Sequence, residues 1–313
     1  MSWMGADGAA KEFRPDADME TTVGAFDPEL VGPWRQTTRR FRRNRVAMVA
    51  LMFVLLVVVA AILAPLVSPQ NPDTLTSSIN AGPSFAHWLG TDDVGRDTLS
   101  RLIWGARISM QVSFQVVLLA LLVALPLGLL AGYRGRYTDS IIMRFMDAMF
   151  AFPPLTLALA VAALLGAGTF TISVAIAVVF VPGFVRIIRA QVLAVKEETF
   201  VEAARSVGSG TGRILRGPVL MNVTSPLIVQ VAISFGYALL AEAGLSFLGF
   251  GVQSPAASWG TMLQSAYQFV LSSPWPMIPP GVAIVLTVLA FNLVGDGLRD
   301  ALGRDAVIAQ SGR

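Results

Sequence analysis

The densest cluster of side chains that could do chemistry lies between two long apolar stretches. Within six residues the chain places three carboxylates and a guanidinium: Asp92, Asp93, Arg96 and Asp97. Such a group could bind a metal ion or a charged ligand. The same residues could instead pair with one another and with turn backbone, with Asp97 capping the next helix. We favour this second interpretation, and we expect His87 to pack at the surface rather than to act as a ligand.

Missing residue types narrow the possible chemistry further. The chain has no Cys and one His, which excludes disulfides and thiol catalysis and argues against a His-rich metal site. Its two lysines, Lys11 and Lys196, lie outside the glycine-rich motif that binds nucleotide phosphates. The glycines of residues 208–212 follow no strand, so a flexible turn explains them better. We therefore predict no catalytic, cofactor-binding or metal-binding residue here, and any ATP that drives this protein must be hydrolysed by another chain.

The composition indicates which elements must position the remaining polar residues. Of 313 residues, 54% are hydrophobic and 14% are charged, against about 25% charged in an ordinary soluble domain. A soluble protein with so few charges would expose large apolar patches. The composition also argues against a disordered chain, a coiled coil and a nucleic-acid-binding module. We predict an all-α, polytopic membrane protein.

Long uncharged runs predict six membrane-spanning helices, since a bilayer core needs about 20 apolar residues per helix. The expected spans are 46–67, 109–132, 145–165, 170–189, 222–247 and 279–298. The expected organisation is a cytoplasmic tail (1–45), the first span (46–67), an extracytoplasmic loop (68–108), a core with five spans (109–302) that includes a cytoplasmic loop at about 196–222, and a cytoplasmic tail (303–313).

The placement of Lys and Arg predicts the orientation, because cytoplasmic loops carry an excess of both. With the N-terminus inside, the inside segments hold 8, 3, 6 and 3 of these residues, which makes 20 of 23. The outside loops keep only Arg96, Arg101 and Arg107. We expect a multi-pass protein of the cell (inner) membrane with both termini in the cytoplasm.

The N-terminal 45 residues divide into an acidic part and a basic part. Residues 1–30 carry seven acids and two bases and are typical of a disordered tail. Residues 35–45 carry six arginines. This basic cluster could recognise membrane lipid, or it could serve only to fix the topology; we favour the second interpretation.

One acid lies inside a predicted span. Glu242 interrupts an otherwise uncharged stretch from 217 to 295. A carboxylate within the membrane is costly, so it should face protein or water rather than lipid. It could contact a cationic peptide terminus, or it could make a structural hydrogen bond near the outer end of the fifth span, which we favour. Asn292 and Asp296, in and near the last span, are further candidates for a pathway or a structural role.

The predicted cytoplasmic loop contains a short amphipathic helix. Acids at its start, including Glu198, suit a helix N-terminus, and Gly208 suits its C-terminal cap. At helical spacing Phe200, Ala204 and Val207 share one face. This face could pack on the bundle itself or on a cytoplasmic protein.

Several motifs together resemble one family of transport proteins. Glu202-Ala203-Ala204, followed after three residues by Gly208, is similar to the EAA loop of ABC-importer membrane subunits. The wider chain, from about 40 to 305, resembles the second permease subunit of the dipeptide, oligopeptide and nickel branch. The matching stretches are 89–92 with 95–97, 105–109, 152–154, 241–249 and 292–300. One departure is Pro218, which precedes the family's usual proline position, here Met221, by three residues.

The resemblance implies a type I ABC-importer transmembrane domain whose EAA loop forms a coupling helix. The residues it assigns to ATPase coupling are Glu198, Phe200, Val201, Glu202, Ala203, Ala204, Val207 and Gly208. The implied partners are a homologous second permease, two ATPase subunits that bind ATP and Mg, and an extracytoplasmic substrate-binding protein. The expected cargo is a di- or oligopeptide.

Other transport classes fit the sequence less well. An ion-coupled secondary transporter should show inverted repeats and several intramembrane acids, whereas Glu242 is the one acid deep within an apolar run. A membrane-embedded enzyme would need a nucleophile and a base, and this chain has no Cys and a single His outside the predicted spans. Within the importer type, nickel chelates and glutathione-like peptides remain alternative cargoes.

Overall fold

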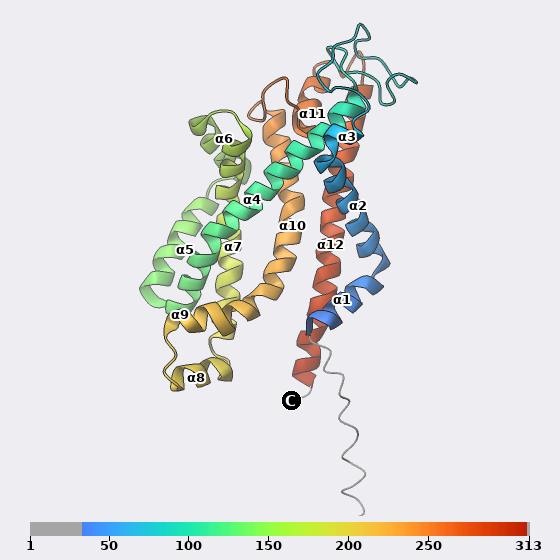
Figure 1. Cartoon of the computed structure of the whole chain (residues 1–313). Coiled ribbons are helices and arrows are strands. Elements are labelled where there is room, and N and C mark those ends of the chain that lie inside the picture. The colour runs from blue at the N-terminus through green and yellow to red at the C-terminus, as the bar shows by residue number, and fades with distance from the viewer. Residues whose placement is uncertain (1–32, 312–313) are drawn as a thin grey trace, which may run out of the picture.

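The computed structural model describes residues 33–311, and this part of the chain is a bundle of helices (Figure 1). The long helices are α2 (Arg45–Ile62), α4 (Thr98–Arg134), α5 (Arg136–Phe150), α6 (Pro154–Leu165), α7 (Thr169–Val195), α10 (Leu220–Phe247) and α12 (Ile278–Ser311). The shorter ones are α1 (Pro33–Arg43), α3 (Ala64–Val67), α8 (Thr199–Ser206), α9 (Thr211–Ile214), the π-helical turn η1 (Leu215–Val219), α11 (Trp259–Tyr267) and the 3-10 turn η2 (Trp275–Met277).

The predicted all-α, polytopic fold is confirmed. Between residues 33 and 311, five helices or joined helices are long and apolar enough to cross a membrane, and the bent pair α5 and α6, taken together, makes a sixth candidate. The third span was expected as one helix over 145–165, which is wrong, because α5 and α6 meet at 92°. Pro153 and Pro154 stand at the break. Proline lacks an amide hydrogen and its ring clashes with the preceding turn, so two in succession end the helix.

Helix boundaries differ from the predictions mainly where polar residues extend a span. α4 begins at Thr98 rather than at 109, so residues 98–108 are helical and not loop. The last span continues as helix to Ser311, well beyond the expected end at 298. The predicted disordered tail at 1–30 lies outside the described residues.

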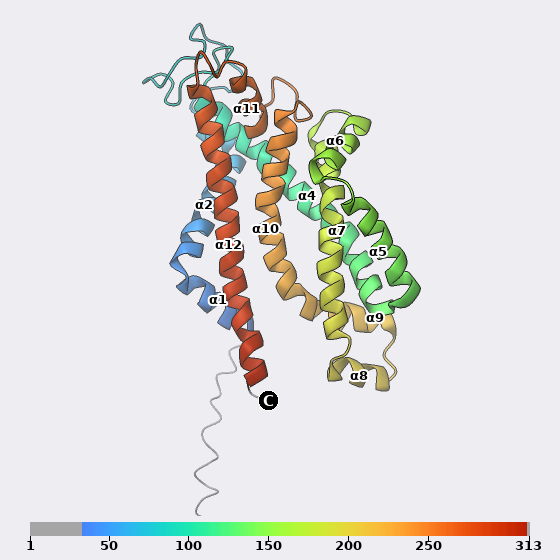
Figure 2. The ribbon, with the colours of Figure 1, turned by 180° about the vertical axis from the view of Figure 1, so that it is seen from behind.

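Close contact between α4 and α7 builds the main core. Gly128 and Gly132 of α4 face Ile188 and Val192 of α7, and a Cβ at Gly128 would lie 2.7 Å from the Ile188 side chain. These glycines allow the two backbones to approach closely. A second apolar cluster joins α2, α4, α10, α11 and α12. Seen from behind, α10 stands between α7 and α12 (Figure 2).

The short elements gather at two opposite ends of the bundle. α1, α8, α9 and the end of α12 lie at one end, and residues 68–97 with α11 lie at the other (Figures 1 and 2). The first group belongs to the segments predicted to be cytoplasmic, and the second to those predicted to be outside. The orientation itself stays a prediction, because the structure contains no membrane.

Candidate functional site

Helix α8 follows α7 and precedes α9 in the chain, and it lies below both of them in Figure 1. Val201 is fully buried and belongs to the main core together with Ile214 and Val219. Ala204, one turn further on, packs against the same core. Because Val201 and Ala204 are three residues apart on the helix, they form one inward face. α8 is thus packed on the bundle through this inward face.

The remaining apolar side chains of α8 are partly or largely exposed. Phe200 is 41% exposed and Val207 is 80% exposed. Ala203, which shares their side of the helix, is exposed as well, and so is Glu202. Helical spacing placed Phe200, Ala204 and Val207 on one face, but these residues differ in burial. Ala204 packs on the core, whereas Phe200 and Val207 remain exposed. The open face combines an apolar centre with an acidic neighbour.

Gly208 ends α8 as predicted. Its φ is +76°, a conformation that costs glycine little and other residues more. The Gly208 amide donates to the Arg205 carbonyl at 2.9 Å, and the Ser209 amide donates to the Ala204 carbonyl at 3.0 Å. These two bonds form the Schellman motif that closes helices at glycine. The following chain is thereby turned toward α9.

Two further features fix the start and the side of α8. Glu198 is the N-cap residue with extended backbone, although its side chain makes no capping hydrogen bond. The Arg205 guanidinium lies 5.3 Å from the centre of the Tyr133 ring at the end of α4. A side-chain hydrogen bond to Tyr133 raises the pKa of Arg205 above its ordinary value. Arg205 therefore stays charged and helps to hold α8 against α4.

The predicted proline break lies between α9 and α10. Pro218 occupies the turn Leu215–Val219, and Gly217 has the non-helical angles φ −96° and ψ −105°. The chain changes direction here before α10 begins. The displaced proline therefore still separates the α8 loop from the fifth span, as expected from the sequence.

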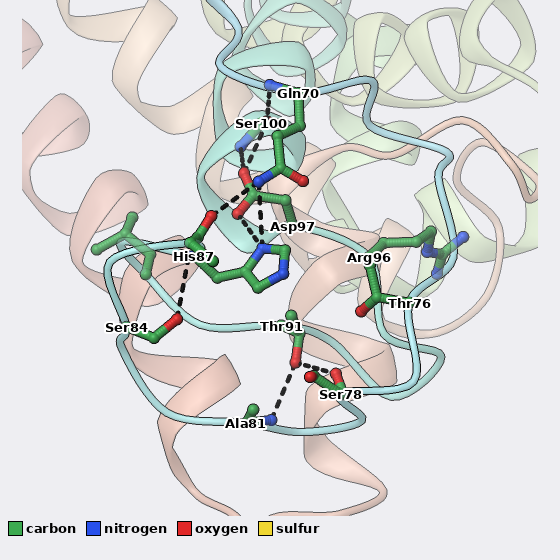
Figure 3. A network of polar contacts seen from close by, with 12 residues as sticks. Gln70, Thr76, Ser78, Ala81, Ser84, His87, Thr91, Arg96, Asp97 and Ser100 are labelled. Carbon is green, nitrogen blue, oxygen red and sulfur yellow. Dashed lines mark hydrogen bonds and ion pairs between the residues drawn. The ribbon is translucent and has the colours of Figure 1, made fainter.

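At the opposite end of the molecule, Asp97 organises a network of polar contacts (Figure 3). Its Oδ2 accepts hydrogen bonds from the Ser100 amide at 2.8 Å and from the Ser100 hydroxyl at 2.7 Å. Its Oδ1 lies 3.0 Å from Nδ1 of His87. Asp97 therefore caps α4, and the single histidine pairs with this cap.

The other acids of the cluster pair with arginine. Asp92 accepts from the Arg96 amide at 2.8 Å and from Arg96 Nε at 2.7 Å, and its Oδ2 lies 3.3 Å from Nε of Arg101. Asp93 lies 3.9 Å from the Arg96 guanidinium. The predicted internal pairing is confirmed. Arg101, whose side chain is buried, is a member of the network that sequence reasoning did not include.

Glu242 lies fully inside the protein, where α4, α10 and α11 meet. It accepts hydrogen bonds from the Ser109 hydroxyl at 2.9 Å and from the Ser246 hydroxyl at 2.7 Å. The Ser109 oxygen in turn accepts from the Trp259 amide at 3.2 Å. Both carboxylate oxygens therefore have donors, and α11 is joined to α4 through the same serine. Ser109 belongs to one of the matching motifs, but only the fold brings it to Glu242.

The remaining candidates lie apart from this junction. Asn292 is half-buried where α10 and α12 approach, with its Oδ1 3.7 Å from a Cβ placed at Gly236. Asp296 is exposed one turn later on α12. The structure thus brings neither of them to Glu242.

The long apolar helices of this fold define a polytopic membrane protein. The family model for the inner membrane component of binding-protein-dependent transport systems matches residues 124–307, more than half of the chain. The chain belongs to this family. A second model, the N-terminal transmembrane domain of oligopeptide transport permease C, matches residues 32–83.

Three curated relatives are similar over nearly their whole length. The dipeptide transport system permease protein DppC of Alkalihalophilus pseudofirmus is 45% identical, over 87% of this chain and 90% of that protein. The glutathione transport system permease protein GsiD of Pectobacterium atrosepticum is 42% identical, over 93% and 98%. The di/tripeptide transport system permease protein DppC of Pseudomonas aeruginosa is 44% identical, over 89% and 95%.

A solved structure has the same fold. A chain from the inward-facing MetNI methionine ABC transporter matches with a TM-score of 0.52, covering 65% of this chain and 96% of that chain. The sequence identity is 18%, so the likeness concerns the fold alone. Family membership and fold together decide in favour of the importer permease and against the ion-coupled secondary transporter.

Proposed function

We propose that this chain is the permease subunit of an ATP-driven importer for di- or oligopeptides. Two of the relatives described above are named as dipeptide or di/tripeptide permeases, and the identities of 45% and 44% extend over most of each chain. In this proposal the chain lines a translocation pathway with a homologous second permease, and an extracytoplasmic binding protein delivers the cargo.

The open face of α8 is the observation that carries the coupling part of the proposal. With Val201 and Ala204 packed on the main core, Phe200 stays 41% exposed and Val207 stays 80% exposed. Exposed apolar side chains next to a charge are typical of a docking surface. We assign this face to docking on an ATPase subunit. The complex would contain two ATPase subunits, which would bind ATP and Mg and hydrolyse the ATP. Their closure would move the two permeases between inward- and outward-facing states.

The orientation belongs to the same proposal. Placing α8 in the cytoplasm puts 20 of 23 Lys and Arg residues on the inside. The chain has no cysteine, so single cysteines can report the topology. Gly210→Cys should react with a membrane-impermeant thiol reagent only after cells are opened. Reaction in intact cells would contradict the proposed orientation.

A second candidate cargo is glutathione or a similar peptide. It is favoured by the 42% identity to the glutathione permease, which covers 93% of this chain. Both cargoes are short peptides, so the difference concerns the binding protein more than the spans described here.

The test is purification of the native complex, identification of its chains, and measurement of ATP hydrolysis with a panel of peptides that includes glutathione. Stimulation by di- or oligopeptides with the binding protein present is the expected result. Hydrolysis that responds to none of the peptides would contradict the cargo assignment, and a complex without an ATPase chain would contradict the importer itself. Glu202→Lys, in which the exposed acid of α8 changes sign, should weaken ATPase retention, because the new charge is repelled by an ATPase surface that is basic where it meets Glu202.

A further inference from the structure

Helix α1 presents a row of arginines away from the bundle. Arg35, Arg39, Arg42 and Arg43 are all exposed and recur at helical spacing. Phe41, on the other side, is buried against Gly297 of α12, where a Cβ would lie 3.1 Å from the phenyl ring. The apolar contact therefore fixes which way the arginines face.

α1 is a separate helix and not an extension of the first span. Asn44 has extended backbone, and its side chain accepts a hydrogen bond from the Ala47 amide at 3.1 Å, which caps α2. α1 consequently turns out of the line of α2 and lies beside the lower part of α12 (Figure 1). A signal that only fixes topology needs positive charge, but it does not need this placement.

The four arginines have no acidic partners within the described part of the chain. None of them makes an ion pair with a carboxylate there. Together with Thr38 they line a hollow of about 500 Å³. Arg43 also borders a second hollow of about 660 Å³, whose lining includes Arg40 of α1 together with Arg299 and Asp300 of α12. Guanidinium groups arranged in this way are suited to bind phosphate oxygens.

An apolar stripe on α2 begins directly beside these arginines. Its members are each more than half exposed: Val46, Val49, Met52, Leu55, Leu56, Val59 and Ile62. Arg45, at the first turn of α2, is exposed as well. A free phosphate or an acidic peptide would have no use for this stripe, whereas a phospholipid carries acyl chains next to its phosphate.

We propose that α1 and the α2 stripe form a binding site for an anionic phospholipid. The phosphate contacts Arg39, Arg42 and Arg43, and the acyl chains lie along α2. Basic residues beside a membrane surface attract anionic lipid, each contributing about 1 kcal/mol, or about fivefold in affinity. The site does not depend on the identity of the cargo.

The experiment counts phosphatidylglycerol bound to the full-length permease in detergent by native mass spectrometry, with phosphatidylcholine as reference. Arg39→Gln with Arg42→Gln should weaken phosphatidylglycerol binding about 25-fold. The matched control is Arg134→Gln with Arg144→Gln, which removes two exposed arginines from another segment predicted to be cytoplasmic. The control should leave binding unchanged.

A lysine pair separates this site from a simple topological signal. Arg39→Lys with Arg42→Lys keeps the charge, and so the insertion, but loses the planar fork that holds phosphate. It should insert normally and bind phosphatidylglycerol several-fold more weakly. Equal binding by the lysine pair and the wild type would overturn the site, and so would equal losses in the glutamine pair and its control.

Two further outcomes identify other occupants. Glycerol 3-phosphate that competes as well as phosphatidylglycerol would show that the phosphate alone is recognised and would overturn the lipid. Loss of an ATPase subunit from the glutamine pair, with unchanged phosphatidylglycerol binding, would assign α1 to a protein partner and overturn the proposal.

Discussion

Two regions at opposite ends of the molecule are both rich in polar side chains, yet they use them differently. Around Glu242 each carboxylate oxygen has a hydroxyl donor, and one of these serines also joins α11 to α4. On α8 the Glu202 side chain is exposed, and Phe200 and Val207 remain 41% and 80% exposed. Internal satisfaction is typical of structure, whereas an open apolar face is typical of docking.

Because the two regions differ in this way, we expect variants in each of them to fail differently. A change at the Glu242 junction should reduce stability before it affects any partner. A change on the outward face of α8 should reduce partner binding at normal stability.

Glu242→Leu should have the largest effect. It leaves the Ser109 and Ser246 hydroxyls without their acceptor in a buried place, and each buried polar group left unpaired costs about 1–3 kcal/mol. Thermal unfolding in detergent should therefore begin at a clearly lower temperature. Glu242→Gln keeps one acceptor oxygen and should lose less. Transport lost by Glu242→Leu at an unchanged unfolding temperature would indicate a cargo contact instead.

Ala204→Trp tests the inward face of α8. Ala204 packs on the main core beside the buried Val201, so a large side chain must displace the helix, at a cost of about 1–3 kcal/mol. Thermal unfolding of the purified permease without its partners should report this loss. Ala203→Trp, one residue away on the open face, is the matched variant and should unfold like the wild type. Equal destabilisation by both would remove the distinction between the faces.

Gly208→Val tests the end of α8. The φ of +76° is strained for a β-branched residue, at about 1–2 kcal/mol. Because nothing lies within 4 Å of a Cβ at Gly208, the strain is confined to the backbone. We expect faster proteolysis of the loop around 208–212 and weaker ATPase binding, with the bundle intact. Gly208→Asn tolerates this conformation better and should behave almost normally; if it fails as badly as Val, backbone strain is not the cause.

Asp97→Ala should have the smallest effect. Loss of a helix cap costs about 1 kcal/mol, and Asp97 also pairs with His87. A small drop in the unfolding temperature is expected, and Asp97→Asn, which still caps, should recover most of it. A drop as large as that of Glu242→Leu would show that the polar network around Asp97 stabilises the fold by far more than a helix cap alone does.

The sequence predicted the features that depend on neighbouring residues. Asp97 as a helix cap and Gly208 as a helix end follow from local backbone chemistry, and long uncharged runs indicate spans whatever their packing. The bend between α5 and α6 was not predicted, although the sequence contains Pro153 and Pro154 at this position. A hydrophobic run indicates a membrane segment, but it does not indicate whether that segment is straight.

Features that need tertiary contacts could not be predicted. Ser109 meets Glu242 across 133 residues of sequence, and no spacing rule connects them. The division of α8 into Val201 and Ala204 inward, with Phe200 and Val207 outward, depends on where the core lies. Helical spacing identifies residues on one side of a helix, but it does not say which side the bundle covers.

The coupling role of α8 is tested most directly by the protection of a single cysteine on its open face. Ala203→Cys, introduced into a chain without cysteines, is labelled with a thiol reagent in the isolated permease and in the assembled complex. Gly303→Cys, at an exposed position on α12, serves as the control. We expect strong labelling at 203 in the isolated permease, strong protection once ATPase subunits are bound, and little change at 303. Equal labelling at 203 with and without bound ATPase would contradict the assignment of α8 as the coupling helix.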